Sequence, residues 1–196
     1  MKPYLRTTEF TTAASSLLMV LNHFNESFEL NRENEFRIWM ASANLPVRAS
    51  SIYGLAVFAK KNGLNPKLVM GEKEYDYPDY RFKAYTKREI DEAKFTSRLF
   101  AKECRDMDIP IEEREFDLAE VKRLVQDGHI VLLRINAGTL REKKSTSNYV
   151  VVFDYEGGYA IMDPVQGKII VDEKLLDEAF HTLQTKKKRD PRMVVF

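Results

Sequence analysis

The chain contains a single cysteine, Cys104, and few glycines for its 196 residues. One cysteine cannot form an internal disulfide bond, so the disulfide framework of small secreted domains is excluded. No apolar run approaches the roughly 20 residues that a membrane-spanning helix needs. The first six residues also lack the apolar core of a signal peptide. We therefore expect a soluble cytoplasmic protein that does not associate with a membrane.

Neither sign of charge dominates, because 31 Lys and Arg nearly balance 30 Asp and Glu. This balance gives no overall field that would attract nucleic acid or an anionic membrane. The many charges, together with the scarcity of Cys and Gly, are typical of a thermophile protein. The length allows one domain with a sizeable core, and we expect a single domain over residues 1–196.

Helical patterns come first along the chain and strand patterns follow. Helices are expected over residues 13–24, 31–45, 51–63, 87–107, 117–128 and 173–183. Strands are expected over residues 64–70, 130–135, 149–155, 159–162, 168–171 and 193–196. The tyrosine-rich stretch 72–85 has no clear period and is interpreted as a loop. This order predicts an α+β fold, with a helical lobe of about residues 1–110 packed on an antiparallel sheet lobe of about residues 111–196.

Two segments far apart in the chain carry the most specific motifs. The first is TEFTTAASSLLM, residues 8–19; the second is NYVVV, residues 148–152, followed by Asp163-Pro164. Together they resemble the C39-like peptidases, which are papain-like cysteine hydrolases. In that family the first helix opens with a sequence like TEFTCGPASLLM, and the base and its orienting carboxylate lie in H-W/Y-V-V-V…D-P. The resemblance covers most of the chain and implies a papain-like α+β fold.

The resemblance also aligns the family's catalytic residues with positions in this chain. The nucleophilic cysteine falls on Thr12, the histidine base on Asn148, and the glutamine of the oxyanion hole on Arg6. The aspartate that orients the base is retained as Asp163. An alcohol ionises well above a thiol, and an amide cannot accept and return a proton as imidazole does. We therefore expect no active catalytic residue at these positions, and the chain is interpreted as a catalytically inactive C39-like pseudo-peptidase.

The function expected from this interpretation is binding of a peptide or protein segment in the former active-site cleft. The candidate binding residues are Arg6, Thr12, Ser15, Asn148 and Asp163. One alternative is a hydrolase or transferase that uses Thr12 or Ser15 with a base that the sequence does not reveal. A second alternative is an RNA- or ribosome-associated protein that uses the basic C-terminal cluster of Lys186, Lys187, Lys188 and Arg189.

Several of these residues also have simpler structural interpretations. Thr12 precedes an apolar helical run, where threonine commonly serves as the N-cap. Asp163 stands before a proline, which is typical of a turn. Cys104 lies on the apolar face of its expected helix, so we expect a buried core residue. None of the three histidines shares a metal-ligand motif with Cys, Asp or Glu, so neither a metal nor another cofactor is expected.

Overall fold

The computed structural model describes residues 1–73 and 84–196. Most of the expected tyrosine-rich loop over residues 72–85 lies outside these ranges. Within the described part, seven helices and a seven-stranded sheet form a mixed α+β fold, which confirms the predicted fold class. None of the helices in residues 1–73 or 84–196 is both long and apolar enough to cross a membrane.

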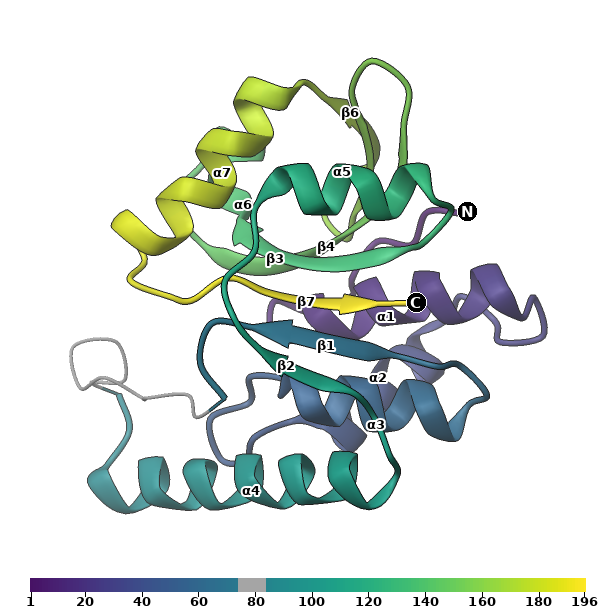
Figure 1. Ribbon diagram of the computed structural model, residues 1–196. Helices are drawn as coiled ribbons and strands as arrows, with labels where there is room; N and C mark the ends of the chain where they lie inside the picture. The colour runs from purple at the N-terminus through teal and green to yellow at the C-terminus, as the bar shows by residue number, and fades with distance from the viewer. Residues whose placement is uncertain (74–83) are drawn as a thin grey trace.

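Figure 1 shows the elements in chain order. The helices are α1 (Thr12–Phe24), α2 (Arg32–Ser42), α3 (Ile52–Lys61), α4 (Lys87–Asp106), α5 (Leu118–Gln126), α6 (Ala137–Leu140) and α7 (Glu173–Thr185). The strands are β1 (Lys67–Met70), β2 (Ile111–Glu113), β3 (Val131–Asn136), β4 (Ser147–Tyr155), β5 (Tyr159–Asp163), β6 (Gly167–Val171) and β7 (Arg192–Val195). The helices and strands expected from periodicity are all present, whereas β2 and α6 were not predicted.

The strands form one sheet in the order β2-β1-β7-β3-β4-β5-β6. Every neighbouring pair is antiparallel except β1 and β2, which run parallel. The expectation of an entirely antiparallel sheet was therefore wrong at this edge. The reason is the connection through α4, which returns the chain so that β2 enters the sheet in the direction of β1. Because β2 has only three residues, its sequence shows no alternation of apolar and polar residues from which the strand or its pairing could be predicted.

The sheet lies between two layers of helices (Figure 1). Successive residues of a strand point to opposite faces, so each central strand contributes to two cores. Leu132, Val151 and Val194 pack in the core beneath α1 and α3, and their sequence neighbours pack in the core against α5 and α7. Because both faces are covered, β3 is buried at all six positions.

Two local expectations have different outcomes. Cys104 is completely buried and its thiol donates a hydrogen bond to the Tyr53 carbonyl at 3.4 Å, so the predicted core role is confirmed. Thr12, in contrast, is not the N-cap of α1. Thr11 occupies that position and Thr12 is the first helical residue. The Thr12 hydroxyl donates instead to the Glu9 carbonyl at 3.0 Å.

Candidate functional site

A hydrogen bond between α1 and β4 positions the two segments that carry the motifs. The hydroxyl of Ser16 donates to the carbonyl of Tyr149 at 2.9 Å, deep in the core. Thr12 lies one helical turn before Ser16 on the same face of α1. Asn148 immediately precedes Tyr149. Thr12 and Asn148 therefore line the same cavity, whose volume is about 630 Å³.

The Thr12 hydroxyl is held by Arg6. Nη1 of Arg6 donates to Oγ1 of Thr12 at 2.6 Å and to the carbonyl of Glu9 at 2.8 Å. The main chain of Arg6 is fixed in turn, because its N–H donates to the Pro164 carbonyl at 2.8 Å. Among residues 1–73 and 84–196, no histidine or carboxylate forms a hydrogen bond with Thr12.

Asn148 and Asp163 are joined by Arg141, which the sequence analysis did not assign to the site. Nε and Nη2 of Arg141 donate to the two carboxylate oxygens of Asp163, each at 2.9 Å, and Nη1 donates to Oδ1 of Asn148 at 2.6 Å. Asp163 is completely buried. Its carboxylate also accepts the N–H of Val165 at 2.6 Å, which confirms the predicted turn. The guanidinium group of Arg141 thus contacts both residues that the motif resemblance aligned with the family's base and its orienting aspartate.

The tight turn after α6 brings Arg141 to this place. Arg141 is the C-cap of α6, and its N–H donates to the Ala137 carbonyl at 3.2 Å. The following loop folds back onto Gly138, where an added Cβ would lie 2.4 Å from the Lys144 carbonyl oxygen. Only glycine allows this approach of the two backbones. The close approach holds the loop that begins at Arg141 against β4.

The site is cationic at this end. The pKa of Arg6 is lowered from its ordinary value, first by burial and then by the neighbouring positive charge of Arg141. An arginine side chain is cationic in proteins and carries five N–H donors but no acceptor atom. Neither group can therefore serve as a proton acceptor for Thr12.

Ser15, the fifth candidate residue, does not line this cavity. It is completely buried, and its hydroxyl donates to the Thr11 carbonyl at 3.1 Å and to Oε1 of Glu35 at 2.9 Å. The buried carboxylate of Glu35 also accepts hydrogen bonds from Thr7, Thr11 and Tyr4. Burial alone would raise the pKa of Glu35, but the hydrogen bonds from Thr11, Thr7 and Ser15 outweigh it and lower the pKa. Glu35 thus ties the N-terminal segment that carries Arg6 to α1 and α2.

A comparison of the sequence with known families identifies the family of the chain. Residues 2–188 match the Peptidase_C39 like family, a range that includes α1 and β4. The chain belongs to the Peptidase_C39 like family. This C39-like chain has no match among curated proteins.

The basic C-terminal cluster of the C39-like chain is divided in the structure. Lys186 and Lys188 are exposed in the turn after α7, whereas Nζ of Lys187 donates to the Ser145 carbonyl at 3.1 Å. Arg189 lines the same cavity as Thr12. In the described ranges, no group of three or more His, Cys, Asp or Glu side chains could hold a metal ion.

Proposed function

We propose that this C39-like chain binds a peptide segment in the cleft between α1 and β4 and does not hydrolyse it. The observation that carries the proposal is the pair of arginine contacts at the family's catalytic positions. Arg6 donates a hydrogen bond to the Thr12 hydroxyl, and Arg141 donates hydrogen bonds to both Asn148 and Asp163. A hydroxyl nucleophile requires a neighbouring group that can take its proton, and neither arginine can do so.

The expected loss of reaction rate is large enough to favour a binding function over a catalytic one. Removing members of a catalytic triad typically costs about 10⁴–10⁶-fold in rate. In this chain both the nucleophile and the base are replaced. Ser15 does not offer a second route, because its hydroxyl is completely buried and a substrate could not reach it.

The cleft itself is suited to a ligand of several residues. Its volume of about 630 Å³ lies within the range of roughly 300–1,000 Å³ that is usual for ligand sites. Apolar and aromatic side chains line it together with polar ones. The apolar and aromatic lining consists of Phe10, Ala13, Val47, Ala49, Ile52, Tyr85 and Tyr149.

A matched pair of tryptophan substitutions tests binding in the cleft. Ala13 is the second residue of α1 and lines the cavity, and Ala119 is the second residue of α5 and is exposed. The full chain is immobilised and exposed to a pool of random hexapeptides, and mass spectrometry measures which peptides are retained. We expect Ala13→Trp to abolish retention and Ala119→Trp to leave it unchanged. Equal retention by both variants, or no retention by the wild type, would contradict the proposal.

A further inference from the structure

Two helices point their N-termini at the cavity, and neither has a side-chain cap. Thr12 and Ala13 of α1 and Ser51 and Ile52 at the start of α3 line it. The N-cap side chains of α1 and α3 make no capping hydrogen bond, whereas those of α2, α4, α5 and α7 each accept one. Uncapped N–H groups and the helix dipole both favour a negative charge at such ends.

The N-cap of α3 supplies a second, independent observation. The side chain of Ser51 is 3% exposed, and its hydroxyl has no hydrogen-bond partner within the described ranges. The N-cap of α1 differs, because the Thr11 hydroxyl is used by Glu35. A buried hydroxyl without a partner costs free energy, so a cavity-lining serine of this kind indicates a polar ligand atom.

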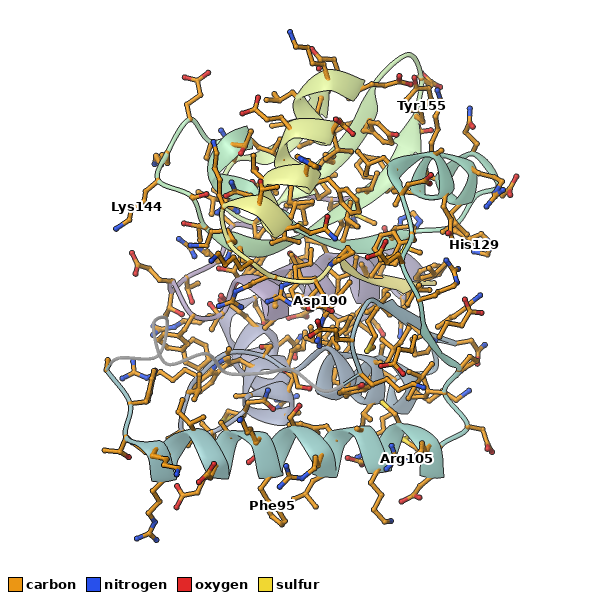
Figure 2. All side chains as sticks on the ribbon, turned by 60° about the vertical axis from the view of Figure 1, so that its left-hand side comes forward. Phe95, Arg105, His129, Lys144, Tyr155 and Asp190 are labelled. Atoms are coloured by element: carbon orange, nitrogen blue, oxygen red, sulfur yellow. The ribbon has the colours of Figure 1, made fainter. Side chains whose placement is uncertain are left out.

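Arginine side chains from three other segments line the same cavity. Arg134 on β3 and Arg192 on β7 are buried and share one carboxylate, that of Asp190, at 3.4 Å and 2.7 Å. Asp190 lies near the centre of the view in Figure 2. Both arginines, and Arg189 between them in the sequence, also have partners other than Asp190. A ligand anion would add to these contacts or replace some of them.

Arg48 lies at the exposed side of the same cavity. It adopts the left-handed backbone conformation with φ of 62°, and its guanidinium lies 5.8 Å from the centre of the Phe10 ring. This cation–π contact holds the charge at the cavity. Its exposure makes Arg48 the arginine best suited to mutation.

We propose that the cavity binds a carboxylate of a peptide, between the N-termini of α1 and α3 and beside Arg48. The carboxylate is either the C-terminal group of the peptide or an acidic side chain. This inference rests on the proposed function and specifies the ligand. The positive charge of the cavity alone would also suit a phosphate. A small inorganic anion, however, would leave most of the cavity and its apolar and aromatic lining without contacts. A peptide with an anionic group matches both features.

Four peptide pools test the chemistry of the ligand. They consist of acetylated hexapeptides that have either a free or an amidated C-terminus and contain either Glu or Gln at otherwise identical positions. We expect the pools with a carboxylate to be retained about tenfold better than the amidated Gln pool, which is the change expected for one charge-assisted contact. The amidated Glu pool and the free Gln pool distinguish the side chain from the C-terminus. The preference should weaken at high salt.

Three variants localise the effect within the molecule. Arg48→Gln and Ser51→Ala should each reduce the preference for carboxylate, while Arg123→Gln, at an exposed position on α5, should leave it unchanged. Thermal melting of each variant confirms that it is folded. Equal retention of all four pools, with retention still lost in Ala13→Trp, would overturn this inference and leave the proposed function standing. Failure of every pool to bind would overturn both, and displacement of bound peptide by a short RNA pool would favour a nucleic-acid ligand instead.

Discussion

The guanidinium group of Arg141 forms two hydrogen bonds with the carboxylate of Asp163, each 2.9 Å long. This fork-shaped pairing is the strongest geometry available between the two side chains. The motif resemblance aligns Asp163 with the aspartate that orients the histidine base in C39-like peptidases. Here the same aspartate pairs with the guanidinium group of Arg141, which in turn donates a hydrogen bond to Asn148. The retained aspartate therefore has a structural role.

Removal of Arg141 should destabilise the fold strongly. Arg141→Ala leaves the carboxylate of Asp163 buried without its cation, and breaking a buried pair in this way typically costs about 3–5 kcal/mol. Urea unfolding measures the change. The matched control is Arg37→Ala, because the pair of Arg37 with Glu33 is exposed and such pairs contribute about 1 kcal/mol or less.

The double variant separates the charge from the packing. Arg141→Ala combined with Asp163→Asn removes the uncompensated charge and should recover part of the lost free energy of unfolding. If Arg141→Ala were no more destabilising than Arg37→Ala, the pairing with Asp163 would not have the structural role assigned to it.

A thiol at position 12 should be unusually reactive. In the Thr12→Cys variant, the guanidinium of Arg6 and the N-terminus of α1 should both lower the thiol pKa, and each lowered unit raises the thiolate fraction about tenfold. Burial raises the pKa of Cys104 to about 12, so the wild type provides an unreactive background. Alkylation by iodoacetamide at pH 7, followed by mass spectrometry, measures the rate.

Substitution of Arg6 in the Thr12→Cys variant serves as the control for the effect of the neighbouring charge. Adding Arg6→Gln to Thr12→Cys removes the neighbouring positive charge and should slow alkylation about threefold to tenfold. An alkylation rate that does not change with Arg6→Gln would show that Arg6 does not act on position 12.

The stability contributed by Glu35 should depend on pH. Its pKa is lowered in the folded chain, so the stabilisation is fully present above the unfolded pKa of about 4.3 and is lost as the pH falls through the folded value. At pH 7, Glu35→Gln should lower the free energy of unfolding by about 1–3 kcal/mol, because the amide cannot accept all of the donors. The difference between wild type and variant should shrink below about pH 4.

Urea unfolding at several pH values tests this dependence, with Glu33→Gln as the exposed control on the same helix. A gap between wild type and Glu35→Gln that stays constant from pH 7 to about pH 3 would rule out a lowered pKa at Glu35.

The parts of the fold predicted correctly are those with strong local signals. The helix α4 was expected over residues 87–107 and spans Lys87–Asp106, because its amphipathic period is long and Thr86 and Glu89 form a capping box. The short elements β2 and α6 have too few residues to show a period. The N-cap of α1 was misplaced by one position because Thr11 and Thr12 are both threonines, and the sequence does not show which of them is the last residue before the helix.

The candidate site was predicted less completely than the fold. The structure brings together Arg6, Thr12, Asn148 and Asp163, as the motif alignment suggested. It places Ser15 on a different face of α1, because the Ser15 hydroxyl is turned to Glu35. Glu35 contacts Thr11, which lies 24 positions away in the sequence, and Arg141 contacts Asp163, which lies 22 positions away. No local pattern identifies such partners.

The most direct test of the account is whether a bound peptide is cut. The wild type and Thr12→Ala are each incubated with the random hexapeptide pool, and mass spectrometry follows the products with time. We predict that the wild type retains peptides and releases no more cleavage products than Thr12→Ala does. Cleavage by the wild type that disappears in Thr12→Ala would contradict the account and identify Thr12 as a nucleophile.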